Sequence, residues 1–328
     1  MKKVLGLALL VFAIAVTTTL LSKDPDSGSY TFLSAYNLEN LLQRVGMFGV
    51  LSLAAAFVIV TGGIDLSIGA VVCVAACVLP WLTKDLGWPG WAAMLATLAL
   101  GALIGAWHGL LIVGLRLQPF VVTLCGLLLY RGAMRLFTKD DTMGFGSSAE
   151  GLRWLATGKL ELTATFGVPV PFLILVAVAS ATWLCWTRTV LGRHLFALGS
   201  NEEAARFAGV ATGRLTVFAY VACSLLATLG GCLFQLDVNS ASASSFGTFY
   251  ELYAIAGAVL GGVALRGGEG MVAGVVLGAS LMQLLPNMIR LAFDSDRLEF
   301  VVVGGVILLG AAADEVLARL LGRRRARG

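Results

Sequence analysis

Continuous apolar runs of helix length are the feature that most constrains how this chain can fold. A helix that crosses a membrane needs about 20 predominantly apolar residues, because each residue advances it by about 1.5 Å. Ten such runs are separated by charged or glycine-rich stretches. They cover about 3–21, 45–62, 64–82, 91–115, 118–137, 169–187, 215–236, 250–265, 271–291 and 298–315. The pattern predicts an all-α polytopic membrane protein with about ten transmembrane helices, some of them discontinuous.

The composition excludes the main alternatives. Charged residues make up 13% of the 328 residues and apolar residues 58%. Soluble domains carry about 25% charged residues, so a water-soluble enzyme is excluded. The runs also lack the alternation of polar and apolar residues that is typical of outer-membrane barrels. Because the spans leave room for short loops only, we expect a single transmembrane domain over residues 1–328.

Basic residues predict the direction in which the chain crosses the membrane, because they concentrate on the cytoplasmic side. With the N-terminus in the cytoplasm, more than half of the 23 Lys and Arg residues fall in cytoplasmic segments. An even number of spans then puts both termini in the cytoplasm. The basic tail 323–327 is interpreted as a membrane-side anchor and not as a nucleic-acid-binding element. Two loops are longer than the rest, a periplasmic loop at about 138–168 and a cytoplasmic loop at about 188–214.

The cytoplasmic loop contains a segment suited to a short helix of two to three turns. Asn201 is a favoured N-cap residue, and the acidic Glu202 and Glu203 suit the first turn. Small residues follow them, with a glycine that can end the helix: Ala204, Ala205, Ala208 and Gly209. Two interpretations stay open. The helix either docks in a groove of another protein or only shortens the loop between two spans.

An acidic residue, Asp65, interrupts a long apolar stretch. An ionised Asp in mid-membrane costs roughly 2.5–3.5 kcal/mol, so it must face protein or a water-filled path. Gly62 and Gly63 allow a break in the helix, and Ser67 can bond to groups that the break exposes. Asp65 is therefore either the N-cap of the next helix or a residue of a substrate pathway. Both interpretations need a discontinuous helix, which transporters often use at their binding sites.

Two runs place a glycine at every fourth residue, a pattern that lets membrane helices approach closely. They consist of Gly101, Gly105 and Gly109, and of Gly270, Gly274 and Gly278. We expect both runs to mediate tight helix packing, either within the chain or in a dimer. Residues 261–270, at the junction of the predicted spans 250–265 and 271–291, are glycine-rich and predict a flexible turn.

No motif for chemistry emerges from the sequence. The phosphate-binding pattern G-x-x-x-x-G-K-[ST] does not occur. Cys73 and Cys77 share a helix face, but no histidine or second thiol pair accompanies them, so we expect core thiols. We therefore expect no catalytic residue, metal or cofactor in this chain. If ATP is used, it is hydrolysed, with its Mg, on another subunit.

Four segments, in order, resemble the permease subunits of bacterial ABC importers for monosaccharides of the ribose, xylose and galactofuranose type. Residues 61–70 are similar to that family's TGGIDLSVG segment, and residues 118–124 with the following Arg131-Gly132 to its PFIxTL…RG segment. Residues 192–209 resemble GRxxxAIGxNxxAAxxxG, and residues 250–268 resemble YELxAIAAVVIGGxSLxGG.

The resemblance implies a permease domain in the inner (plasma) membrane that works by alternating access. It implies four kinds of partner: an ABC ATPase subunit, a periplasmic sugar-binding protein, a second permease subunit that is a copy or a relative, and a monosaccharide. It assigns ATPase coupling to Arg193, Asn201, Glu202, Glu203, Ala204, Ala205 and Gly209. The substrate pathway is placed at Gly62, Gly63, Asp65, Ser67, Phe120 and Thr123.

One departure from the family pattern is Arg266, a charge where relatives have none. The alternative function is an ion-coupled secondary transporter that works without an ATPase, with Asp65 as its ion ligand. A structural scaffold that transports nothing is a third class.

Overall fold

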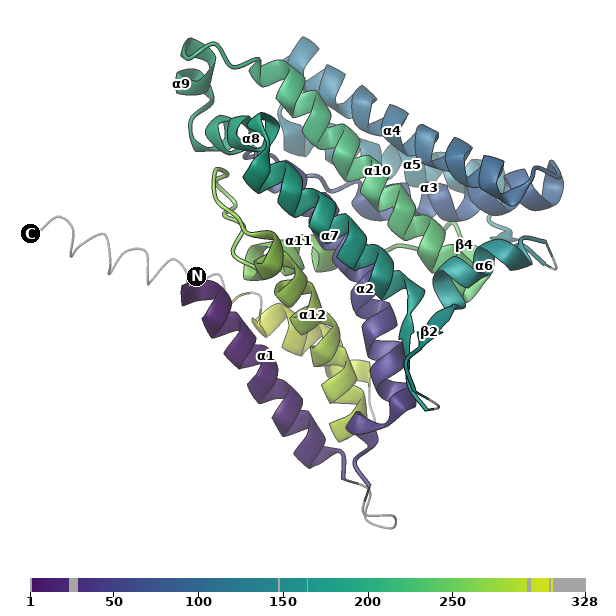
Figure 1. Ribbon diagram of the computed structural model, residues 1–328. Helices are drawn as coiled ribbons and strands as arrows, with labels where there is room; N and C mark the ends of the chain where they lie inside the picture. The colour runs from purple at the N-terminus through teal and green to yellow at the C-terminus, as the bar shows by residue number, and fades with distance from the viewer. Residues whose placement is uncertain are drawn as a thin grey trace, which may run out of the picture.

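The computed structural model describes residues 2–23, 29–146, 148–163, 165–293, 296–306 and 308. Most of them are helical (Figure 1). The helices are α1 (Lys2–Leu21), α2 (Ala35–Ile59), α3 (Ile68–Pro80), α4 (Gly90–Gly114), α5 (Pro119–Thr138), α6 (Glu150–Thr157), α7 (Val170–Arg188), α8 (Val190–Ser200), α9 (Glu202–Phe207), α10 (Thr212–Val238), α11 (Tyr250–Leu260) and α12 (Val272–Phe293). The short strands are β1 (Thr142–Met143), β2 (Lys159–Glu161), β3 (Gly167–Pro169) and β4 (Ala241–Ser242).

Eight described helices are long and apolar enough to cross a membrane. They are α1, α2, α3 with its π-helical extension Trp81–Asp85, α4, α5, α7, α10 and α12. This confirms the predicted all-α polytopic class. The span expected at 250–265 differs, because α11 has only 11 residues. That length is about 16 Å, half of a typical hydrocarbon core.

The structure describes only part of the C-terminal span that the sequence predicts. Residues 299–306 are helical, in agreement with the start of the span expected at 298–315. Most of the remainder of that span, and the basic tail 323–327, lie outside the described residues.

Helix α2 is the centre of the bundle. Every side chain from Val45 to Val60 is buried, because this stretch is apolar on all faces and packs against α7, α10, α11 and α12. The helix begins at Ala35, ten residues before the predicted span, where the Ser34 hydroxyl accepts the Asn37 N–H. Hydropathy detects only the apolar part of a helix. The first ten residues of α2 include polar residues, so the predicted span began later than the helix does. In α3, Cys73 and Cys77 are buried, as expected for core thiols.

Helix α1 lies at the edge of the bundle, along α12 (Figure 1). Its apolar side chains are mostly exposed in the isolated chain, including Leu5, Phe12 and Leu20. A continuous apolar surface of this length suits contact with lipid. The helix therefore adds a membrane span but little to the core.

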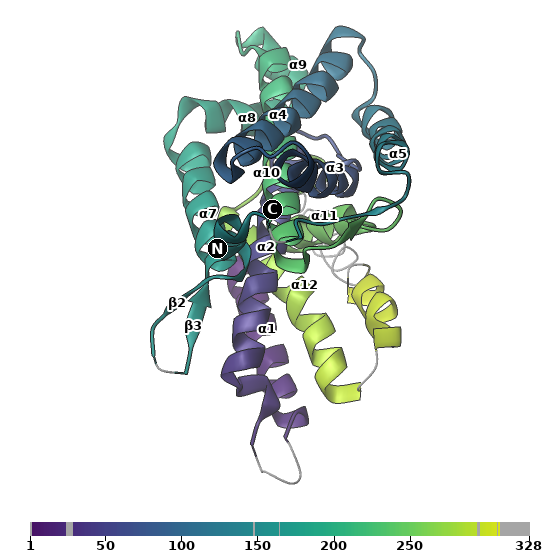
Figure 2. The same cartoon turned by 90° about the vertical axis from the view of Figure 1, so that its right-hand side faces the viewer.

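The two long loops form opposite ends of the molecule. The loop after α7 folds into α8 and α9 at one end, while the β2–β3 hairpin and the C-terminal end of α1 lie at the other (Figures 1 and 2). Strand β2 pairs with β3, and β1 pairs with β4, both antiparallel. We call these ends the α9 end and the hairpin end. The charge distribution predicts that the α9 end is cytoplasmic.

Candidate substrate pathway and coupling segment

The helix break predicted around Asp65 is present between α2 and α3. The N–H groups of Gly62 and Gly63 close the end of α2 by donating to the carbonyl oxygens of Ile59 (2.9 Å) and Val58 (3.1 Å). Gly62 has a φ of +84°, a left-handed conformation that glycine adopts without a Cβ penalty. The chain then runs without helical structure to Ile68, where α3 begins.

Asp65 is 2% exposed and bonds mainly to its own segment. Its Oδ1 accepts the Ser67 N–H at 2.8 Å and the Ser67 hydroxyl at 2.6 Å. The Cys223 thiol of α10 donates to Oδ2 at 3.6 Å. Since Ser67 is the N-cap residue of α3, the carboxylate stabilises the turn that restarts the helix. This geometry is an Asx turn directly before the helix, so Asp65 is not itself the N-cap residue of α3.

Helix α5 touches the same break. The Thr123 hydroxyl donates to the carbonyl oxygen of Ile64 at 3.2 Å, and also to that of Pro119 at 3.0 Å in its own helix. Phe120, one residue after the start of α5, is instead exposed. Of the two pathway residues predicted on α5, the structure brings Thr123 to the break and places Phe120 on the surface.

A cavity of about 840 Å³, the inner cavity, joins the break to the cytoplasmic loop. Thr61, Gly62 and Gly63 line one side of it, and Glu202, Glu203 and Arg206 of α9 line another. Arg116 and Gln118 of the α4–α5 turn complete its edge. Asp65 and Ser67 are not among its lining residues, so the acid lies behind the cavity wall.

The segment predicted to couple to an ATPase forms α9. The Asn201 side chain accepts the Ala204 N–H at 2.9 Å, and Gly209 follows the helix with a φ of +81°. N-cap and terminating glycine thus lie where the sequence predicts them. The helix has six residues, less than the two to three turns expected, because the chain turns at Ala208 towards α10.

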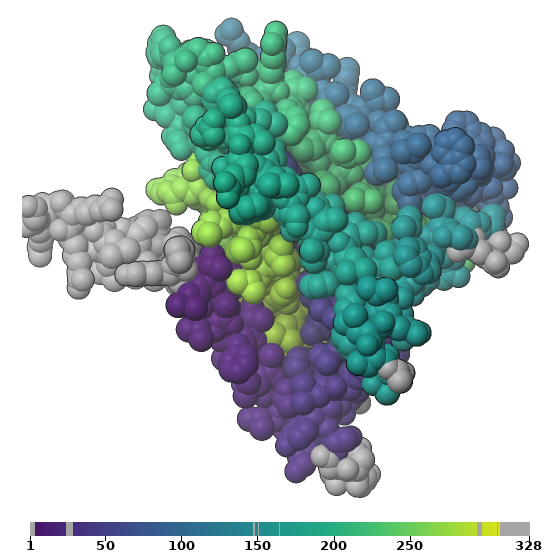
Figure 3. Space-filling model, viewed as in Figure 1, coloured from purple at the N-terminus to yellow at the C-terminus, as the bar shows by residue number. Residues whose placement is uncertain are grey.

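The small-residue face of α9 is divided between the interior and the surface. Ala205 is 6% exposed and packs inward, whereas Ala204 and Ala208 are exposed. Phe207 is 81% exposed, and the sequence reasoning missed it. The available signal was a large aromatic residue in the segment 201–209, which otherwise consists of polar, charged and small residues. Arg193 on α8 is also exposed, and α9 protrudes at its end of the molecule (Figure 3).

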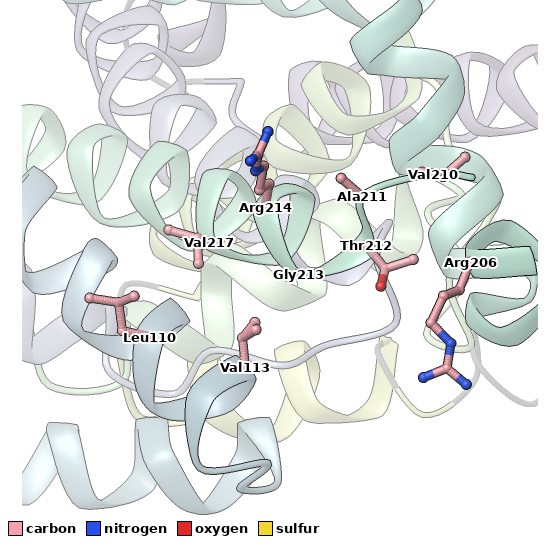
Figure 4. Close-up of a pocket in the computed structure, with 9 residues that line it drawn as sticks. All are labelled: Leu110, Val113, Arg206, Val210, Ala211, Thr212, Gly213, Arg214 and Val217. Carbon is pink, nitrogen blue, oxygen red and sulfur yellow. The ribbon is translucent and has the colours of Figure 1, made fainter.

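Helix α9 is tied to α10 by a short turn. The Val210 N–H donates to the Ala205 carbonyl oxygen at 3.0 Å, and α10 starts at Thr212. Arg206 and Arg214 extend in different directions on either side of this turn, beside a shallow pocket of about 610 Å³ (Figure 4). The start of α10 is therefore attached to α9 through one short turn.

Backbone hydrogen bonds attach the glycine-rich turn 261–270 to the rest of the chain. The Gly268 N–H donates to the Val60 carbonyl oxygen at 2.9 Å, and the Ala264 N–H donates to that of Glu269 at 3.1 Å. Arg266 forms an exposed ion pair with Glu269 at 2.8 Å. The turn is thus attached to the end of α2, directly before the helix break.

Both glycine rows pack inside the chain. On α4, the positions of Gly101, Gly105 and Gly109 face α10, and a Cβ at Gly105 would overlap the backbone of Tyr220. The second row faces α11. A Cβ at Gly274 or Gly278 would overlap the carbonyl groups of Gly261 or Gly257, while a Cβ at Gly270 would lie 3.2 Å from the Val263 side chain, a tight contact.

Towards the hairpin end lies a group of polar residues that the sequence reasoning missed. Arg44 of α2, Asp237 of α10 and Arg290 of α12 line two adjoining cavities, of about 370 Å³ and 400 Å³. The predicted spans 45–62 and 215–236 ended beside Arg44 and Asp237, the span 271–291 included Arg290, and none of the three residues was assigned a role. The available signal was that the helices continue through them, and charges on membrane helices usually face protein or a cavity.

Comparison with known proteins agrees with this architecture. A family model described as "Branched-chain amino acid transport system / permease component" matches residues 37–311. The chain is 35% identical to the ribose import permease protein RbsC of Escherichia coli (strain K12), over 94% of this chain and 92% of that protein. No solved structure matches.

Two other relatives are of the same kind. RbsC of Bacillus subtilis (strain 168) is 32% identical over 94% of this chain and 91% of its own length. The xylose transport system permease protein XylH of Escherichia coli (strain K12) is 30% identical over 88% of this chain and 87% of its own length. The chain belongs to this family of transport-system permease components. It is a multi-pass protein of the inner membrane.

Proposed function

We propose that this chain is the membrane-spanning subunit of an ABC importer that moves a monosaccharide across the inner membrane by alternating access. The observation that carries the proposal is the similarity to a ribose import permease over 92% of that protein's length. The description of the family model names branched-chain amino acids, whereas the relatives named above are sugar permeases. The sugar class therefore rests on these relatives.

A separate ATPase subunit supplies the energy in this proposal, with ATP and Mg bound there. Two observations support it. The sequence contains no G-x-x-x-x-G-K-[ST] motif. In addition, α9 presents Ala204 and the 81% exposed Phe207 at the end of the molecule predicted to be cytoplasmic. An exposed aromatic side chain beside small residues suits docking into a groove of a partner.

The geometry supports a route from the ATPase to the pathway. Closure of the ATPase pair moves α9, which shares the inner cavity with the break at Gly62 and Gly63. Because α9 also continues into α10, its movement shifts the Cys223 segment that contacts Asp65. A second permease subunit and a periplasmic sugar-binding protein complete the importer in this proposal.

Uptake in reconstituted vesicles tests the proposal. The chain is reconstituted with its ATPase and sugar-binding protein, and accumulation of labelled D-ribose and D-xylose is measured. Uptake that requires both ATP and the ATPase subunit is expected. Uptake that persists without any ATPase, driven by a sodium or proton gradient, would instead support the ion-coupled alternative. In that alternative Asp65 binds an ion, but its carboxylate already accepts three hydrogen bonds from protein groups.

A further inference from the structure

The two adjoining cavities at the hairpin end form one polar chamber, the outer chamber. They share Arg44, Met47, Asp237 and Arg290. The chamber lies between α2, α10, α11, α12 and the helical residues 299–306. Each compartment, at about 370 Å³ and 400 Å³, has the size of a small-molecule site.

One buried donor in the chamber lacks an acceptor. Gln283 is 5% exposed, and its Nε2 has no hydrogen-bond partner among the described residues. Arg44 and Arg290 also line the chamber, and Arg44 interacts electrostatically with Asp237. A buried amide without a partner costs about 1–3 kcal/mol, so such a group indicates a ligand that supplies the missing acceptor.

Acceptors are present in the same chamber. Asp237 receives a hydrogen bond from Gln43 Nε2 at 2.8 Å, which leaves carboxylate lone pairs unused. Glu299 accepts the Tyr253 hydroxyl at 2.7 Å. A ligand that both donates and accepts at several positions matches this mixture of donors and acceptors. Hydroxyl groups do both.

Aromatic rings form the deeper wall. The centroids of Phe48, Phe234 and Tyr250 lie 4.8 to 5.0 Å from one another. The backbone is strained here, because Phe249, a bulky residue, has a φ of +67° directly before α11. The strain places a ring beside Phe300 at the chamber edge, with 5.9 Å between centroids. Aromatic faces pack well against the C–H faces of a sugar ring.

We propose that the outer chamber binds a neutral monosaccharide within the permease itself, with Gln283 and Asp237 bonding its hydroxyl groups and Tyr250 covering its apolar face. This inference rests on the proposed function and adds a site to it. The wall of the second compartment carries neutral amides, including Asn37, Asn40 and Asn287. Neutral amides suit hydroxyl groups better than the branched apolar side chain of an amino acid, which needs an apolar pocket.

The test measures binding to the permease–ATPase complex in lipid nanodiscs, without any sugar-binding protein. Saturation-transfer difference NMR is recorded with D-ribose, D-xylose and L-leucine as separate probes. We expect a signal with at least one of the two pentoses and none with L-leucine. The variants Gln283→Leu and Asp237→Asn are each expected to weaken pentose binding about tenfold, the effect of one lost hydrogen bond.

The matched control is Asp141→Asn, which removes an exposed carboxylate of the loop after α5. It is expected to bind pentose like the unmodified protein. Equal binding by Gln283→Leu, Asp237→Asn and the control would overturn the assignment, and so would a signal with L-leucine alone. If none of the probes binds while the complete importer still takes up a pentose, the inference fails and the proposed function stands. If the complete importer takes up no sugar, the proposed function fails.

Discussion

Gly199, near the end of α8, lies against the carbonyl oxygen of Val60 so closely that a Cβ at position 199 would overlap it. The same carbonyl accepts the Gly268 N–H at 2.9 Å. Three segments far apart in the sequence therefore meet through their backbones at one point: α8, the end of α2 and the turn after α11. This junction connects the cytoplasmic loop to the helix break without an intervening side chain.

Gly199→Ala is expected to reduce ATP-driven uptake strongly and to lower the melting temperature of the permease. Its methyl group has no space, and overpacking typically costs about 1–3 kcal/mol. Uptake in vesicles and thermal unfolding in detergent measure the two effects. The control is Gly6→Ala in α1, where no atom lies within 4 Å of the new methyl group. Equal behaviour of the two variants would contradict a functional junction.

Ala204→Trp is expected to detach or uncouple the ATPase while the permease keeps its melting temperature, because position 204 is exposed. Ala205→Trp is expected to lower the melting temperature as well, since that side chain is buried at 6% exposure. Phe207→Ala should weaken ATPase binding without affecting folding. Co-purification of the ATPase, sugar uptake and thermal unfolding separate these outcomes. Full ATPase binding by both Ala204→Trp and Phe207→Ala would remove α9 from the interface.

Asp65→Asn is expected to retain most transport, because an amide oxygen can still accept from the Ser67 N–H and hydroxyl. Asp65→Ala leaves these buried donors without a partner, at a cost of about 1–3 kcal/mol. The melting temperature and uptake of the two variants are compared at several sodium concentrations and pH values. Loss of transport in Asp65→Asn with unchanged stability would show that the charge itself is needed, as an ion-coupled transporter requires.

Gly105→Ala is expected to destabilise the protein by about 1–3 kcal/mol, because its methyl group would push α4 away from the Tyr220 backbone of α10. Gly114→Ala in the same helix has no atom within 4 Å and is expected to be neutral or slightly stabilising. Thermal unfolding of the two variants provides the comparison. If Gly105→Ala left the stability unchanged, α4 and α10 could move apart at little cost in free energy.

Arg266→Ser is expected to change stability by less than about 0.5 kcal/mol and to leave uptake unchanged. The ion pair with Glu269 is exposed, with 77% and 61% of the two side chains accessible, and exposed pairs contribute little. Thermal unfolding and vesicle uptake at low and high salt provide the check. A large, salt-sensitive loss would indicate that the departure from the family pattern at Arg266 has a role at the cytoplasmic edge.

The sequence predicted the elements whose signal is local. The cap at Asn201, the left-handed Gly209 and the break at Gly62 follow from backbone preferences of single residues, and the structure has all three geometries. The class of fold followed from apolar runs, which report on the membrane environment. The start of α2 at Ala35 was missed because hydropathy detects burial in lipid and does not detect helix that continues into water.

Features that depend on contacts between distant segments could not be predicted from the sequence. The outer chamber forms because Arg44, Asp237 and Gln283 come from three helices that the fold brings together. No sequence motif links these three residues. Likewise, nothing local distinguishes Ala204 from Ala205, and only the packing of α9 turns one of them inward.

The glycine rows have a mechanical consequence. They bring α4 against α10 and α11 against α12 at backbone distance, where even one added methyl group would collide. Helices held this closely resist sliding past each other more than helices separated by long, rotatable side chains. We therefore expect α4 with α10, and α11 with α12, to move as pairs, so that changes in shape occur where the pairs meet α2, which packs against α10, α11 and α12.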